Sequence, residues 1–247
     1  MTTALITNDD GIESSGLRSL ARMAIDAGLK VTIAAPAVQS SGSSASILGT
    51  EAEGRVPLER RRLEGFDVPT FAVHAAPALI SLLAEHGAFG TAPDIVFSGV
   101  NRGANVGRAI LHSGTVGAAL TAGVNGARGM AVSLDVGLDP DTCHWNVAAP
   151  FVAQLIPVLL DRPVGTVFNL NVPNVTTPIE LREGPLASFG VVQTLMAHAG
   201  DQHVRLSVSD TPTEQDAGTD AALLLDGYAT VTNITSVSQS RVPVLAR

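Results

Sequence analysis

The chain has 247 residues, 45% of them hydrophobic, and a formal net charge of −8 at pH 7. This acidic balance disfavours binding to nucleic-acid polymers, because such proteins neutralise phosphates with an excess of Lys and Arg. The single cysteine, Cys143, excludes an intrachain disulfide and a zinc site made of several thiolates. We see no secretory leader and no apolar stretch of about 18 residues, so we expect a cytoplasmic protein without a membrane span.

Strand-like apolar runs alternate with helix-like segments along the first two thirds of the chain. The pattern predicts strands at Thr3–Thr7, Lys30–Ala35, Asp94–Ser98, Met130–Leu134 and Thr166–Leu170. It predicts helices at Leu17–Ala24, Ala78–Glu85, Val116–Val124 and Val147–Leu160. Such alternation is typical of an α/β fold with a doubly wound parallel sheet.

The character of the chain changes after about Pro173. Shorter segments with β-branched residues follow, such as His203–Val208 and Tyr228–Thr235, and they predict hairpins or an arm. We therefore divide the chain into a core, residues 1–173, and a C-terminal segment, residues 174–247, that completes the same domain.

The first predicted strand runs directly into Asp9 and Asp10. Adjacent carboxylates repel each other unless a cation lies between them or one takes up a proton, so the pair suggests a metal ion. The alternative is a helix start, in which Asp9 or Asp10 is the N-cap and Glu13 adds favourable charge to the first turn.

Two further polar segments also follow predicted strands: the serine-rich stretch Ser40–Ser46 and the stretch Gly99–Asn101. Alone, the first is typical of a flexible loop. Ligands of open α/β sheets bind beyond the carboxyl ends of the strands, however, so we expect these segments and the Asp9–Asp10 pair to converge on one site.

A fourth segment, Ser113-Gly114-Thr115, opens a predicted helix whose free amides and dipole favour an anion such as phosphate. The alternative is ordinary helix capping by Ser113 or Thr115. The glycine-rich stretches match neither the P-loop nor the dinucleotide-binding pattern, which disfavours nucleotide-triphosphate hydrolysis and dinucleotide redox chemistry.

Taken together, these motifs resemble the SurE survival-protein family of metal-dependent nucleotidases and acid phosphatases. The matching segments follow the family's order over nearly the whole chain: Thr7–Ile12, Ala35–Gly42, Pro93–Asn101, Gly103–Ala119, Asn169–Pro173, Thr219–Asp220 and Gly227–Thr232.

The resemblance implies a Rossmann-like, mostly parallel sheet with a C-terminal β-hairpin or arm that joins two or four copies. It implies one divalent cation, Mg²⁺ or Mn²⁺, with the ligands Asp9, Asp10, Ser41 and Asn101. The reaction implied is hydrolysis of nucleoside 5′-monophosphates to nucleoside and phosphate, with activity on the 3′ isomers left open. Asp9 and Asp10 would be the catalytic carboxylates, and the phosphate would be bound by Asn8, Asn105, Ser113, Gly114 and Thr115.

Several positions depart from the family pattern. Ala37-Val38 replaces a charged pair, Ser40 replaces an arginine, Arg108-Ala109 replaces acidic residues, and Ala75–Leu79 replaces a Gly-Thr-Pro-x-Asp segment. These departures leave the base preference open. His112 stands where the family commonly has an aromatic residue, and we interpret it as part of a pocket wall.

Other functions remain as alternatives. They are a non-catalytic sensor or scaffold that binds a nucleotide or metal, a broad-specificity phosphatase or exopolyphosphatase, and a carbohydrate or sulfate ester hydrolase.

Overall fold

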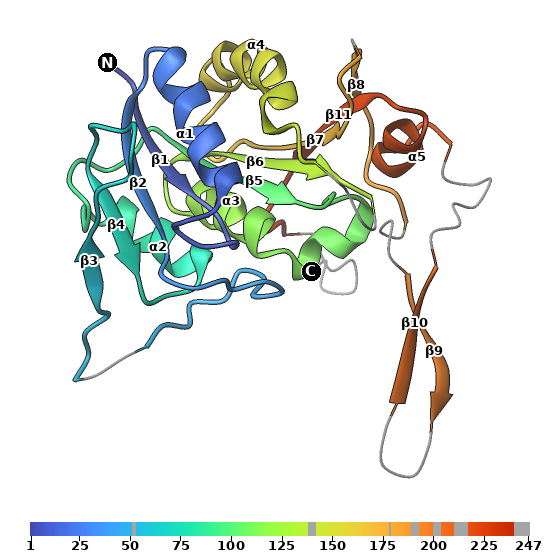
Figure 1. Ribbon diagram of the computed structural model, residues 1–247, viewed down its shortest axis with the longest axis horizontal. Coiled ribbons are helices and arrows are strands. Elements are labelled where there is room, and N and C mark those ends of the chain that lie inside the picture. The colour runs from blue at the N-terminus through green and yellow to red at the C-terminus, as the bar shows by residue number, and fades with distance from the viewer. Residues whose placement is uncertain are drawn as a thin grey trace, which may run out of the picture.

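The computed structural model describes residues 1–50, 53–137, 142–177, 179–188, 193–199, 204–209 and 217–239. Within them, one large sheet has the strand order β3-β4-β2-β1-β5-β6-β7-β11-β8 (Figure 1). The strands of this sheet are β1 (Thr3–Thr7), β2 (Lys30–Pro36), β3 (Leu58–Arg60), β4 (Thr70–Val73), β5 (Ile95–Arg102), β6 (Arg128–Asp135), β7 (Val167–Pro173), β8 (Leu181–Glu183) and β11 (Ala229–Ile234). In the sheet order β4-β2-β1-β5-β6-β7, each strand is parallel to its neighbours. β3 pairs antiparallel with β4, and β11 pairs antiparallel with β7.

Helices cover both faces of the sheet. The helices are α1 (Ser15–Asp26), α2 (Pro77–Glu85), α3 (Gly114–Val124), α4 (Ala149–Leu160) and α5 (Asp220–Leu225), with 3₁₀ turns η1 (Gly107–His112) and η2 (Trp145–Ala148). α1 packs with α4, and α2 packs with α3. Successive side chains of a strand point to opposite faces, so Ile6 joins the hydrophobic cluster with α1 and α4, while Leu5 joins the cluster with α2. This doubly wound α/β architecture confirms the predicted fold class.

The five predicted strands and four predicted helices are present, with ends shifted by a few residues. The pattern missed β3, β4 and β8, which have only three or four residues each, and the short helix α5. It was wrong for Tyr228–Thr235, because β11 joins the main sheet beside β7 and is not part of an arm.

A separate hairpin does lie in the C-terminal segment. Strands β9 (Gln193–Ala199) and β10 (Val204–Ser209) pair antiparallel as a sheet of their own, and Figure 1 shows them reaching away from the main sheet. His203, at the start of the predicted segment, lies outside the described residues. The division at residue 173 stays a prediction. Within the described residues, none of the helices is both long and apolar enough to cross a membrane.

Asp220 fastens the C-terminal segment to the rest of the fold. Its side chain is fully buried, and Oδ2 accepts a hydrogen bond from the Gly107 amide at 2.9 Å. Oδ1 accepts from the amides of Ala187 and Ala221, each at 2.8 Å. One carboxylate therefore satisfies three backbone donors from separate parts of the chain, which holds η1 in place.

We predict that Asp220→Ala lowers the free energy of unfolding by about 3 kcal/mol, because buried amides lose their acceptor. Urea denaturation followed by circular dichroism measures the change. Asp226→Ala, which removes an exposed aspartate just after the same helix, is the matched control and should change stability by less than about 0.5 kcal/mol. Equal stability of the two variants would contradict the fastening role of Asp220.

Candidate active site

The turn after β1 is shaped by Asn8. This side chain is fully buried; its Nδ2 donates to the Gly11 carbonyl at 3.1 Å and to Ser14 Oγ at 2.7 Å, and its Oδ1 accepts from the Gly11 amide at 3.2 Å. All of these bonds stay within the turn. Asn8 therefore shapes the turn and does not line the cavity described below; its contact with a phosphate stays a prediction.

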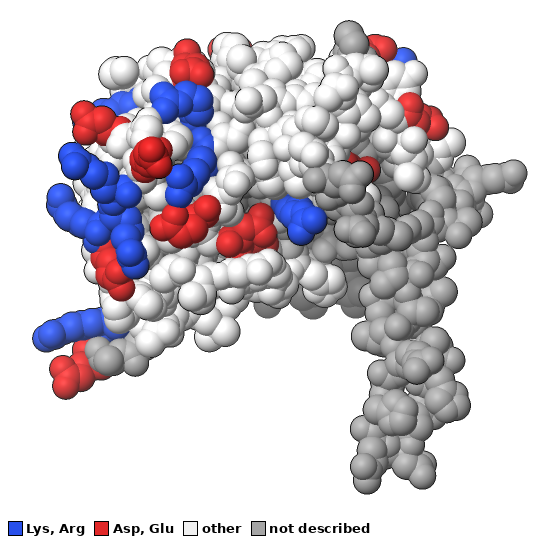
Figure 2. All heavy atoms as spheres, in the orientation of Figure 1, with Lys and Arg blue, Asp and Glu red and all other residues white. Residues whose placement is uncertain are grey.

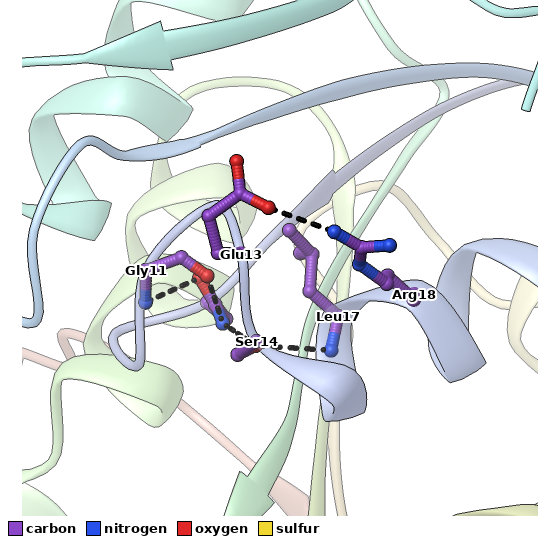
Figure 3. Close-up of polar contacts among 6 residues, drawn as sticks. Gly11, Glu13, Ser14, Leu17 and Arg18 are labelled. Carbon is purple, nitrogen blue, oxygen red and sulfur yellow. Dashed lines mark hydrogen bonds and ion pairs between the residues drawn. The ribbon is translucent and has the colours of Figure 1, made fainter. Parts of the chain in front are cut away.

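Ser14, and neither aspartate, caps the helix that follows. Its Oγ accepts from the Leu17 amide at 3.2 Å. Glu13 pairs instead with Arg18 at 2.7 Å, as Figure 3 shows. The alternative that Asp9 or Asp10 is the N-cap is therefore wrong, and both carboxylates are left for another purpose.

The predicted polar segments do converge. A cavity of about 410 Å³ at the carboxyl ends of the strands is lined by Asp9, Asp10, Gln39, Ser41, Gly42, Asn101, Arg102, Asn105, Ala109, His112 and Ser113. The four predicted metal ligands thus reach one cavity from the segments that follow β1 and β2 and from the end of β5. His112 belongs to its wall, as expected.

Asp9 is held in a fixed orientation. Its Oδ1 accepts a buried hydrogen bond from Thr115 Oγ1 at 2.6 Å, which leaves Oδ2 for other partners. Asp10 is freer, because its one hydrogen bond that the structure defines is a long one from the Arg102 amide, at 3.4 Å. The two neighbours therefore differ: one carboxylate is fixed, and the other can adjust.

The neutral oxygens of the site are also positioned. Asn101 Nδ2 donates to the Gly103 carbonyl at 2.7 Å, which fixes the amide and leaves Oδ1 available as a ligand. β5 contains one extra residue relative to β6 just before Asn101, and such a bulge re-aims the side chains that follow it. Ser41 Oγ accepts from Gln39 Nε2 at 2.9 Å. Sequence reasoning missed Gln39, which adjoins the ligand serine in the same loop.

The start of α3 packs directly against Asp9. A Cβ atom at Gly114 would lie 2.5 Å from Ser43 Oγ and 3.0 Å from Asp9 Oδ2, so no larger residue fits there without displacement. Gly117, one turn on, allows the same close approach to the backbone of Ser44. These two glycines bring α3 onto the loop that carries Ser41.

This close packing changes the expected roles at the helix start. Thr115 is fully buried and its hydroxyl is used by Asp9, and neither it nor Gly114 lines the cavity. Thr115 therefore orients Asp9, and the contact of Thr115 and Gly114 with a phosphate stays a prediction. Ser113 does line the cavity, and its Oγ also accepts from the Val116 amide at 3.1 Å as the helix N-cap. Capping and contact with the cavity coexist in Ser113, because the hydroxyl hydrogen stays available.

Asn105 is fixed by two buried asparagines of β7. Asn169 and Asn171 each donate from Nδ2 to its carbonyl at 2.8 Å, and Asn171 Oδ1 accepts from its amide at 2.7 Å. The Asn105 side chain donates to Ser133 Oγ at 2.8 Å. The sequence analysis gave Asn169 and Asn171 no role in the site; two asparagines in an otherwise apolar strand are the signal that could have identified them.

The aspartates are costly to ionise in the protein alone. Burial raises the pKa of Asp9, although hydrogen bonds from Thr115 oppose that shift. Burial also raises the pKa of Asp10, and the negative charge of Asp9 raises it further. A positive charge in the cavity would relieve both effects.

The donor set fits a hard divalent cation. Two carboxylates, a hydroxyl and an amide oxygen are the ligands that Mg²⁺ and Mn²⁺ prefer. In the part of the chain that the structure describes, there is no cluster of three or more His, Cys, Asp or Glu side chains able to hold a metal ion. A zinc-type site is therefore not found there.

The chain is similar to known proteins over most of its length. The family model described as survival protein SurE matches residues 4–196. The chain belongs to the SurE family. The resemblance noted from the motifs is confirmed by this match.

Individual SurE proteins are also similar to this chain. The 5′-nucleotidase SurE of Symbiobacterium thermophilum is 40% identical over 176 residues, which are 70% of this chain and 66% of the relative. The 5′-nucleotidase SurE of Clostridium botulinum (strain Eklund 17B / Type B) is 31% identical over 92% of this chain and 91% of the relative. The crystal structure of the SurE protein from Aquifex aeolicus matches with a TM-score of 0.72 and 26% identity, over 96% of this chain and 95% of that one. The match thus spans just under two thirds of the first relative and nearly all of the other two.

We predict that Asp10→Asn stabilises the protein at neutral pH when a chelator is present. A carboxyl whose pKa is raised by folding keeps its proton longer in the folded state. Stability is therefore lost as pH rises from the ordinary value near 3.8 through the raised pKa, and it stays lower above that. The variant lacks this loss. Its gain should be absent below about pH 3.8 and reach about 0.5 kcal/mol at pH 8, a small value because Asp10 is partly exposed to solvent.

Urea denaturation at a series of pH values measures this gain. Asp67→Asn, at an exposed aspartate, is the control and should follow the native pH dependence. A variant that is less stable than the native protein at pH 8 would show that Asp10 contributes net stability, against the prediction.

Proposed function

We propose that this SurE-family chain is a divalent-metal-dependent phosphomonoesterase that hydrolyses nucleoside 5′-monophosphates to nucleoside and phosphate. The convergence of Asp9, Asp10, Ser41 and Asn101 on one polar cavity carries the proposal. The names of the relatives, 5′-nucleotidase SurE, support the substrate class.

In this proposal Asp9, Asp10, Ser41 and Asn101 hold one Mg²⁺ or Mn²⁺ ion. When bound, such an ion polarises a phosphoryl oxygen and makes a bound water more acidic. The two positive charges of the ion would neutralise the two carboxylates, so the site would no longer repel an anionic substrate.

Residues on the other side of the cavity would bind the phosphate. The Ser113 hydroxyl can donate to a phosphoryl oxygen while its own oxygen caps α3. The side-chain Nδ2 of Asn105 donates one hydrogen to Ser133 and has a second that it can donate to the phosphate. Arg102 adds a positive charge to the cavity wall. Fixed donors of this kind stabilise the charge that develops on the phosphoryl oxygens in the transition state.

Asp9 is the candidate for base or nucleophile. Thr115 donates to its Oδ1 and so orients the carboxylate, which lines the cavity. Whether Asp9 acts as base or nucleophile stays open, and so does activity on 3′-nucleotides.

We also expect a homodimer or homotetramer joined through the C-terminal arm. The β9–β10 hairpin supports this, because among the described strands β9 and β10 pair only with each other, and they extend away from the main sheet. A nucleic-acid polymer is not an expected partner: on the face drawn in Figure 2, basic side chains are interspersed with acidic ones. The cytoplasmic location stays a prediction.

The proposal predicts phosphate release from 5′-nucleoside monophosphates that needs metal and is lost in Asp10→Asn. The assay uses a panel of 5′- and 3′-nucleoside monophosphates with Mg²⁺, with Mn²⁺ and with chelator. We expect a fall in kcat/KM of about 100-fold or more in the variant, since a metal ligand is lost.

Asp67→Asn, distant from the cavity, should keep native activity. The stability predicted above for Asp10→Asn separates loss of chemistry from loss of folding. A metal-loaded native protein that binds nucleotide without turnover would favour the sensor or scaffold alternative, and equal turnover of sulfate or carbohydrate esters would favour a different hydrolase.

A further inference from the structure

A second cavity, of about 660 Å³, opens beside the candidate active site. The two cavities share Gln39 and Gly42, and the chain between these residues contains Ser41. A molecule bound by its phosphate in the first cavity can therefore extend directly into the second.

The walls of this second cavity are held open by the fold itself. Its floor is formed where β2, β4 and the start of α2 meet. The segment around Gly49 runs antiparallel to Ala75, with hydrogen bonds from the Thr50 amide to the His74 carbonyl and from the Ala76 amide to the Leu48 carbonyl, both at 2.8 Å. A cavity formed by backbone pairing is available before a ligand arrives.

The lining of this cavity is neutral and largely apolar. Val38 and Leu48 line it and are 74% and 75% exposed, so their apolar surface is available to a ligand. His74 is the one titratable side chain among the described lining residues, and its Nε2 lies 3.5 Å from Glu59 Oε1. No Lys or Arg belongs to that described lining.

Positions that depart from the family pattern gather in this cavity. Ala37, Val38, Ser40, Ala75 and Ala76 all line it. These five departing positions therefore share one surface beside the metal-ligand candidates, whereas Ala109, another departing position, lines the first cavity with those candidates.

We infer that the second cavity binds the nucleoside part of the substrate and selects an uncharged leaving group over an anionic one such as a phosphate chain. The inference rests on the proposed function. A base laid against Val38, Leu48 and Ala75 removes apolar surface from water at both partners, which favours binding.

Binding of a phosphate chain in the second cavity would be unfavourable. Each further phosphate brings negative charge into a space whose described lining offers no cationic side chain, and that charge loses hydration without gaining a partner. At the start of α2, the Ala76 amide is already bonded to Leu48 and Pro77 has no N–H, so neither of these two residues can donate to a phosphate oxygen. Arg102 lines the first cavity and not the second.

The test compares kcat/KM for adenosine 5′-monophosphate, ribose 5-phosphate and inorganic tripolyphosphate, with Mg²⁺ or Mn²⁺. We expect the native protein to prefer adenosine 5′-monophosphate over each of the others by about tenfold or more, equivalent to about 1.4 kcal/mol. Leu48→Arg places a cation at the cavity and should lower the preference over tripolyphosphate by about tenfold. The matched control is Val164→Arg, which adds the same charge at an exposed position. Val164 lies just before β7, at the amino end of that strand, whereas both cavities lie at the carboxyl ends of the strands.

Each outcome decides one question. Ribose 5-phosphate turned over as efficiently as the nucleotide, or an equal effect of Leu48→Arg and Val164→Arg, would overturn the inference while leaving the phosphomonoesterase in place. Failure of the native protein to release phosphate from any ester would overturn the proposed function. Titration calorimetry of adenosine 5′-monophosphate against ribose 5-phosphate would then test the cavity alone, and equal affinities would overturn the inference.

Discussion

The hydrogen bond from Thr115 to Asp9 is the interaction on which the site's geometry depends. It is short and buried, and it joins the end of β1 to the first turn of α3. It forms only because Gly114 leaves no side chain between the helix and the carboxylate. The same contact presses α3 against the serine-rich loop. A single close approach therefore sets the orientation of one carboxylate and the position of the loop that carries Ser41.

Buried polar side chains organise the opposite wall. Asn169, Asn171 and Asp220 are all fully buried, and their partners are backbone groups of the segment from Asn105 to Gly107 or of nearby loops. These hydrogen bonds favour one arrangement of the loop, since another arrangement would leave the same buried groups unpaired. Asn169 takes part through Nδ2 alone, because its buried Oδ1 has no defined partner. The irregular stretch between β5 and α3 is thus fixed without regular secondary structure of its own.

The sequence predicted most of the regular fold and the convergence of Asp9, Asp10, Ser41 and Asn101, because apolar periodicity marks strands and parallel strands share one carboxyl edge. It did not predict β3, β4 and β8, whose three or four residues are too few for a clear alternation. It misassigned β11, since pairing with β7 is a tertiary choice that local residues do not encode. The sequence also did not predict the hydrogen bonds of Asn8 within its turn and of Thr115 with Asp9. Motif position indicates that a polar residue is near a site, but not which hydrogen bonds its side chain makes within the fold.

The two cavities are lined mostly by different segments of the chain. The segment from Ala37 to Thr50 supplies one candidate metal ligand and otherwise forms the wall of the neighbouring cavity, while the carboxylates and the phosphate side belong to other strands and helices. Val38 and Leu48 line the second cavity and not the first. Under the proposed function, a substitution at either position can therefore change which ester is accepted while the groups that cleave the ester stay the same.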